Sequence, residues 1–192
     1  MSLIFLETNH KHMKLLEIKD DEVVAMDDYP IHDLLDGDSV IIKLYFRIFQ
    51  KKCESIIART VVLPKDLIAS AFDKTIQKKF FDFEKSHPEV TYFALDGNHR
   101  TTAASLTRST IPVMLFENDQ DCTDVQKMND TAGIFRPYTN NTIHECVLEL
   151  KDHFLNVKQF YTVKEKTKKM VDDTAVQMPQ YMRDSFNKKI TK

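Results

Sequence analysis

The chain has 192 residues, of which 42% are hydrophobic, and it carries 27 Lys and Arg against 29 Asp and Glu. Thirteen phenylalanines and the absence of low-complexity runs predict a folded globular protein and exclude a disordered chain. A formal net charge of −2 argues against a protein whose main task is to grip DNA, because such proteins usually carry a strong basic excess.

The charge is distributed unevenly. Residues 1–50 hold five basic and ten acidic side chains, whereas residues 151–192 hold ten basic and five acidic ones. We expect the two ends to attract each other. The basic end is interpreted as a solvated helical surface, with a DNA-binding patch as the alternative.

No membrane association is expected. The apolar run 40–49 is too short to span a bilayer and is interrupted by Lys43 and Arg47. The first six residues lack the basic flank and the cleavage site of a signal peptide. A cytoplasmic location is therefore predicted.

The cysteines support the same location. Cys53, Cys122 and Cys146 are scattered along the chain and odd in number. This pattern argues against a disulfide framework or a zinc site and fits a reducing compartment. Each cysteine is interpreted as a small hydrophobic core residue.

The first quarter of the chain begins with a predicted strand at 12–18, followed by an acidic turn. The carboxylates around this turn are interpreted as a solvated loop, with Mg²⁺ binding or general-base catalysis as the alternative. They are Glu17, Asp20, Asp21 and Glu22. Residues 38–52 fit both strand alternation and helical spacing, and Asp38 as an N-cap favours a helix.

A strand is expected at 59–63, and Pro64 then opens one long helix at 65–85. The phenylalanines of this helix have helical spacing, which predicts core packing and not a stacking platform for bases. The uncharged run 90–95, rich in β-branched and aromatic residues, predicts a buried strand. Residues 102–106 read as the next helix.

The Asp96-Gly97 turn connects that strand to that helix. The first N–H groups of the helix would point beyond the strand's carboxyl end, which makes an anion site. Because the chain has only three glycines, Gly97 is interpreted as a position that needs positive φ or close ligand approach.

Side chains beside the turn suit a phosphate. Arg100 offers a planar fork of donors, His99 a titratable donor, and Thr101 and Thr102 add hydroxyls. The alternative is an ordinary exposed Asp-Gly turn.

The run Phe-Ala-Leu-Asp-Gly-Asn-His-Arg at 93–100 is followed by Ala103-Ala104 and by a strand that opens Ile-Pro-Val at 111–116. This pattern resembles the signature of the ParB/sulfiredoxin superfamily. The superfamily includes chromosome-partition CTP switches, sulfiredoxins, nuclease-like domains and an ADP-dependent free-serine kinase. The resemblance implies an α/β (α+β) fold with a small mixed sheet flanked by helices, and a nucleotide whose phosphates lie over the helix start.

Departures from the family pattern narrow the function. Asn98 stands where sulfiredoxins carry a reactive cysteine, so a sulfiredoxin is not expected. The run 96–100 differs at one position from the D-G-H-H-R of the kinase-like members, and no helix-turn-helix like that of partition proteins is evident. A nuclease is disfavoured because no carboxylate cluster of metal spacing accompanies the motif.

The resemblance implies phosphoryl transfer or nucleotide hydrolysis, with ATP, ADP or CTP and Mg²⁺, and catalytic roles for Asp96 and His99. The residues expected to bind the nucleotide or its phosphates are Gly97, Asn98, His99, Arg100, Thr101 and Thr102. The alternative is a non-catalytic ParB-like module that binds DNA or a protein partner through the basic C-terminal helices.

The C-terminal part of the chain is predicted to be mainly helical. A short helix at 122–129 leads to a loop at 133–138, which is expected to close an α/β domain spanning 1–138. Residues 139–192 are predicted to form a helical extension that covers this domain, with a homodimer contact as the alternative. Thr162 to Glu165 form a capping-box pattern that opens one of its helices.

Overall fold

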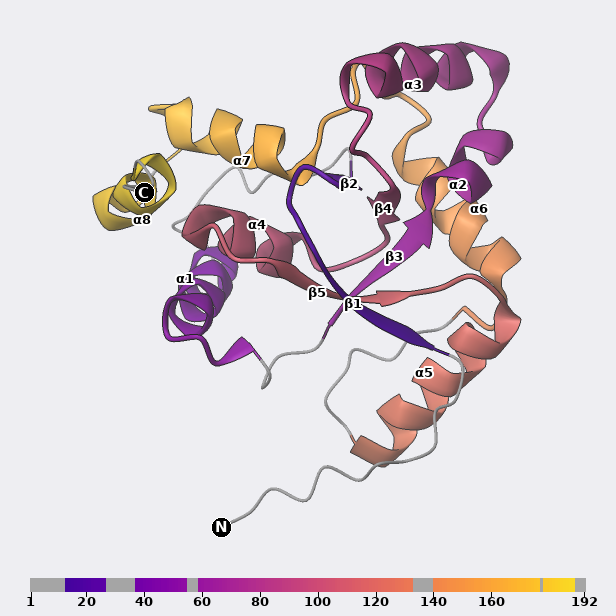
Figure 1. Ribbon diagram of the computed structural model, residues 1–192, viewed down its shortest axis with the longest axis horizontal. Coiled ribbons are helices and arrows are strands. Elements are labelled where there is room, and N and C mark those ends of the chain that lie inside the picture. Colours follow the sequence, from indigo (N-terminus) through magenta and orange to yellow (C-terminus); the bar gives the residue numbers. More distant parts are fainter. Residues whose placement is uncertain (1–12, 27–36, 55–58, 133–139, 177, 189–192) are drawn as a thin grey trace.

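Five short strands form one mixed sheet in the order β1-β5-β3-β4-β2 (Figure 1). The computed structural model describes residues 13–26, 37–54, 59–132, 140–176 and 178–188. The β1/β5 and β3/β4 pairs are antiparallel, and the β3/β5 and β2/β4 pairs are parallel. The strands are β1 (Lys14–Ile18), β2 (Val23–Val24), β3 (Thr60–Pro64), β4 (Tyr92–Ala94) and β5 (Ile111–Leu115). The predicted α/β fold with a mixed sheet is confirmed.

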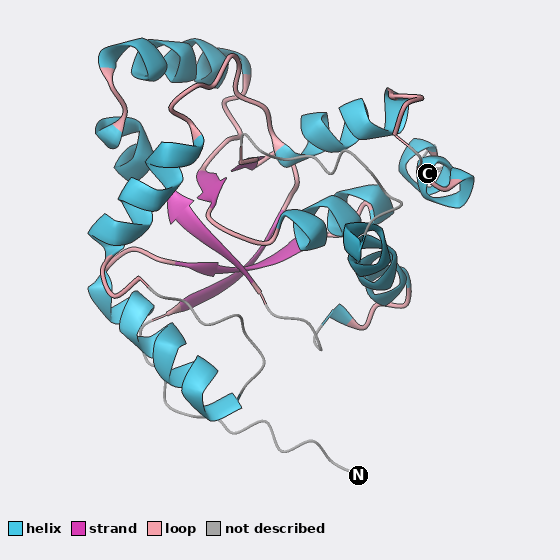
Figure 2. Ribbon diagram, turned by 180° about the vertical axis from the view of Figure 1, so that it is seen from behind, coloured by secondary structure: helices cyan, strands magenta, loops and turns pink. Residues whose placement is uncertain are grey.

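Helices cover both faces of the sheet (Figures 1 and 2). Buried residues of α1, α4, α7 and α8 share one hydrophobic cluster, and those of α2, α3, α5 and α6 share the other. The β3 side chains alternate between the two, because Val61 and Leu63 join the second cluster and Val62 joins the first. The helices are α1 (Gly37–Gln50), α2 (Lys65–Ala71), α3 (Lys74–Ser86), α4 (Asn98–Thr107), α5 (Asp119–Ala132), α6 (Ile143–His153), α7 (Val163–Asp172) and α8 (Gln180–Asn187).

The prediction of one long helix at 65–85 is wrong, because this segment forms two helices, α2 and α3. The break lies at Asp73, whose carboxylate accepts hydrogen bonds from Thr75 N at 2.8 Å and Ile76 N at 2.9 Å. This N-cap satisfies first-turn donors of α3 and so starts a new helix. The segment 38–52, which fits both a strand and a helix by its sequence, lies mostly in helix α1, as the N-cap pattern favoured. Helix α4 begins at Asn98, four residues before the predicted start at residue 102.

A cluster of aromatic rings fills the second core around Phe93 of β4. The Phe93 ring lies 5.2 Å from that of Phe80 and 5.4 Å from that of Phe154, measured between centroids. The whole cluster comprises Phe72, Phe80, Phe83, Phe93, Phe154 and Phe160. Phe80 and Phe83 of α3 are therefore core residues, as predicted, whereas Phe81 of the same helix is exposed. Phe154 and Phe160 come from the predicted extension, so that segment shares a core with the sheet; the expected boundary loop at 133–138 lies outside the described residues.

Phe93→Ala is expected to lower the free energy of unfolding by about 3–5 kcal/mol, because it removes a fully buried ring and leaves a cavity beside the four phenylalanine rings that it contacts. Phe81→Ala is the matched control. That ring is 44% exposed, and its loss should change stability far less. Chemical denaturation of both variants measures the difference, and equal losses would contradict the assignment of Phe93 to the centre of this core.

The cysteine prediction holds for two positions only. Cys122 and Cys146 are fully buried members of the second core, whereas Cys53 is exposed. None of the helices in the described ranges is long and apolar enough to cross a membrane.

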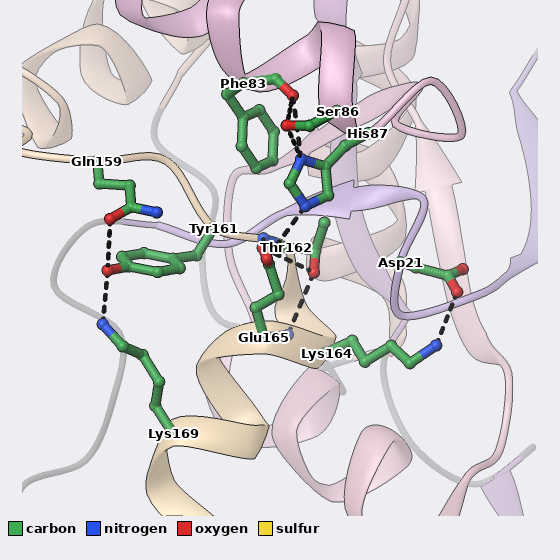
Figure 3. A network of polar contacts seen from close by, with 10 residues as sticks. All are labelled: Asp21, Phe83, Ser86, His87, Gln159, Tyr161, Thr162, Lys164, Glu165 and Lys169. Atoms are coloured by element: carbon green, nitrogen blue, oxygen red, sulfur yellow. Dashed lines mark hydrogen bonds and ion pairs between the residues drawn. The ribbon is translucent and has the colours of Figure 1, made fainter.

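His87 joins the end of α3 to the start of α7 (Figure 3). Its Nδ1 lies 3.0 Å from the Phe83 carbonyl oxygen, and its Nε2 lies 3.0 Å from Oε1 of Glu165. Glu165 also accepts from Thr162 N at 2.9 Å, which completes the predicted capping box. Burial lowers the pKa of His87, but the Phe83 carbonyl and the Glu165 and Glu89 carboxylates outweigh it and raise that pKa overall.

This network predicts a pH-dependent contribution to stability. Because the folded pKa is raised, the stabilisation is fully present below the unfolded pKa of about 6.5 and is lost as pH rises through the higher folded value. The melting temperature of the native chain should exceed that of His87→Gln most at about pH 5.5, below the unfolded pKa of histidine, and the gap should narrow above about pH 7. A gap that stays constant or widens with pH contradicts the assignment.

Candidate anion site at the start of α4

Gly97 redirects the chain from β4 into α4 in the left-handed conformation, with φ 83° and ψ 28°. Residues other than glycine are strained there, so the prediction of positive φ is confirmed. The first bond of the helix runs from Thr101 N to the Gly97 carbonyl at 2.9 Å. Gly97 offers no side-chain acceptor to cap the first turn. The first turn of α4 therefore has no side-chain N-cap from Gly97.

The chain itself also approaches Gly97 closely. A Cβ at this position would lie 2.6 Å from Thr60 Oγ1, at the start of β3, and 2.9 Å from Arg100 Nη2. Both distances are shorter than van der Waals contact. Gly97 is thus required by the turn and by the two polar side chains that lie against it.

The Asp96 side chain connects the Gly97 turn to β3 and to α4 through two hydrogen bonds. Its Oδ1 accepts a hydrogen bond from Val61 N at 2.7 Å, and its Oδ2 accepts one from Arg100 Nη2 at 2.6 Å. The Arg100 side chain is only 13% exposed. The ion pair holds the guanidinium against Gly97, so Asp96 acts as a positioning group in this structure.

The two threonines of the motif face inward. Thr101 Oγ1 donates to the Asn98 carbonyl at 3.1 Å, and Thr102 Oγ1 donates to the same oxygen at 2.6 Å. Both residues are buried. Their donor hydrogens are therefore engaged in the first turn of α4, and the structure does not place them as phosphate donors. His99 lies in the same turn and is half-buried.

Three buried polar atoms at this turn have no hydrogen-bond partner among the described residues. They are Thr60 Oγ1, Asn98 Oδ1 and Arg100 Nε. A buried polar group without a partner costs about 1–3 kcal/mol, so such atoms call for a partner from outside the chain. The hydroxyl and the guanidinium N–H are donors that suit an anion oxygen, and the amide oxygen suits a hydroxyl or amine. The sequence does not single out Thr60, because nothing in the residues around it indicates that it meets a turn 37 positions later.

The acidic residues near β1 make contacts outside the Gly97 turn. Asp20 accepts from Ser105 Oγ in the second half of α4, and burial raises the pKa of Asp20. Asp21 pairs with Lys164 at 3.0 Å, and Glu17 pairs with Arg59 at 3.1 Å. The solvated-loop interpretation thus fails for Asp20, which fastens α4 to the turn after β1.

The described part of the chain contains no group of three or more His, Cys, Asp and Glu residues arranged to hold a metal ion. At the turn, the Asp96 carboxylate already accepts from Val61 N and carries the ion pair with Arg100. Such a carboxylate does not fit a protein ligand of Mg²⁺, because the neighbouring guanidinium opposes a second cation.

No protein-family model, curated protein or solved structure matches the chain. The resemblance to the ParB/sulfiredoxin superfamily stays a prediction that rests on residues 93–116. The geometry of the turn is an independent observation.

Gly97→Ala is expected to destabilise the protein by about 1–2 kcal/mol through its backbone alone, and further through the contact with Thr60 Oγ1. In a Thr60→Ala background the same change should be less damaging, because the nearest atom is gone. A double-mutant cycle by chemical denaturation measures this coupling. Equal effects of Gly97→Ala in both backgrounds would show that the two residues do not meet.

Proposed function

We propose that the chain binds the phosphate groups of a nucleotide at the N-terminus of α4, against Thr60, Gly97 and Arg100. The observation that carries this proposal is the pair of buried donors, Thr60 Oγ1 and Arg100 Nε, that lack partners within the described residues and lie beside an uncapped helix start. The helix N-terminus adds partial positive charge, which favours an anion.

The nucleotide itself is supported by the motif. The Asp-Gly-x-His-Arg run resembles the one over which nucleotide phosphates lie in the ParB/sulfiredoxin superfamily. In this reading Gly97 leaves room, Arg100 and the helix start neutralise phosphate charge, and Asp96 keeps Arg100 in place. The proposed reaction is phosphoryl transfer or nucleotide hydrolysis. In such a reaction His99 would hydrogen-bond a phosphoryl oxygen.

The alternative function is a non-catalytic module that would bind DNA or a protein partner through the basic C-terminal helices. Most lysines of α7 have partners within the chain. Lys164 pairs with Asp21 and Lys168 with Asp172, and Lys169 Nζ bonds Tyr161 Oη at 2.6 Å. Such internal contacts lessen the charge available to a phosphate backbone, so they favour the nucleotide proposal.

Arg100→Ala should weaken binding of ADP, ATP or CTP at least about tenfold in calorimetric titration, which corresponds to about 1.4 kcal/mol. The matched control is Arg108→Ala at the other end of α4, where the guanidinium bonds the Phe186 carbonyl and binding should not change. The titrations are run with and without Mg²⁺. Equal affinities for the native chain and Arg100→Ala would contradict the assignment, as would the absence of binding by all three nucleotides.

Thr60→Val provides a test that does not depend on the ion pair. Removing an unpartnered buried hydroxyl while keeping the side-chain shape should leave the stability of the unliganded protein unchanged or raise it by up to about 1 kcal/mol. The same change should weaken nucleotide binding, because a ligand oxygen loses a donor. Thermal melting with and without ADP measures both effects. If ADP stabilised Thr60→Val as much as the native chain, Thr60 would not be part of the binding site.

A further inference from the structure

Two cysteines face each other between α5 and α6, away from the proposed anion site. Cys122 Sγ and Cys146 Sγ are 3.8 Å apart, and both residues are fully buried in the second core. They are separated by 24 positions in the sequence. Each thiol is a polar partner of the other within the second hydrophobic cluster.

Two hydrogen bonds join α5 to the start of α6 and to the segment just before it. Ile143 N donates to Asp119 Oδ1 at 2.7 Å, which joins the start of α6 to the start of α5. One turn beyond Cys122, Gln126 Nε2 donates to the Asn140 carbonyl at 3.0 Å. The two sulfurs therefore stay near each other, and a rotation of the side chains with a small helix shift would bring them to the disulfide bond length of about 2.05 Å.

The contact makes the two thiols unequal. The contact with Cys146 lowers the pKa of Cys122, against the opposing effects of burial, Asp119 and Asp121. The same contact, together with burial, raises the pKa of Cys146. Cys122 is thus the better nucleophile, because the thiolate is the reactive form.

We propose that Cys122 and Cys146 form a reversible disulfide that links α5 to α6 when the protein is exposed to hydrogen peroxide. In the first step the Cys122 thiolate attacks the peroxide, forming a sulfenic acid as the O–O bond breaks and the leaving oxygen departs as water after protonation. In the second step Cys146 sulfur attacks the Cys122 sulfur, the S–O bond breaks, and a second water leaves. The two thiols lose two electrons in total, which reduce the peroxide.

The experiment uses the full chain with Cys53→Ser, which removes the exposed thiol without touching the core. After hydrogen peroxide treatment, alkylation of the denatured protein should find both remaining thiols blocked, and dithiothreitol should restore them. The oxidised protein should form no disulfide between chains and should melt higher by on the order of 5–10 °C, because the cross-link restricts the unfolded chain. In the double variant Cys53→Ser/Cys146→Ser, Cys122 should instead accumulate as a sulfenic acid that dimedone traps.

Peptide mapping of the peroxide-treated wild-type chain tests the link without any substitution. A fragment that joins Cys122 to Cys146 supports the proposal. Thiols that remain alkylatable, or Cys122 oxidised to a sulfinic acid without cross-linking, would overturn it.

Discussion

The site depends on the Asp96 carboxylate, because its two hydrogen bonds join the Gly97 turn to β3 and to α4. Its two oxygens accept from Val61 N at the start of β3 and from Arg100 Nη2 in the first turn of α4, and it directly precedes the left-handed Gly97. The neighbouring bond from Leu95 N to the Val61 carbonyl extends the β3/β4 pairing up to the turn. Without Asp96, the guanidinium would lose its fixed position and the turn would lose its bond to the sheet.

The location of the site follows from the two-sided core. Strands β2 to β5 are largely buried, so the polar groups of these strands that serve a ligand lie at the strand ends. Thr60 occupies such an end, and the chain passes from β4 into α4 beside it. The turn after β1 supports the other end of the helix, where Asp20 accepts from Ser105. α4 is thus fixed near both of its ends, and these contacts set the orientation of its N-terminus.

The sequence predicts the local features of this arrangement and not the long-range ones. Positive φ at Gly97, the capping box at Thr162 and the core phenylalanines follow from residue chemistry or spacing alone. The break at Asp73 was missed because the helical spacing of apolar residues continues across it and hides the cap. Thr60 beside Gly97, and Cys122 beside Cys146, were missed because only the chain's path through space brings each pair together.

The most direct test of the proposed anion site is an NMR titration of the isotope-labelled chain with ADP, followed through the backbone amides. A nucleotide phosphate over the start of α4 predicts the largest shift changes at Gly97, Asn98, His99 and Arg100, together with Thr60 and Val61, because ligand oxygens would meet these N–H groups or their immediate neighbours. Inorganic phosphate should perturb the same amides at higher concentration. Saturable changes that leave these residues unaffected and map elsewhere would contradict the account.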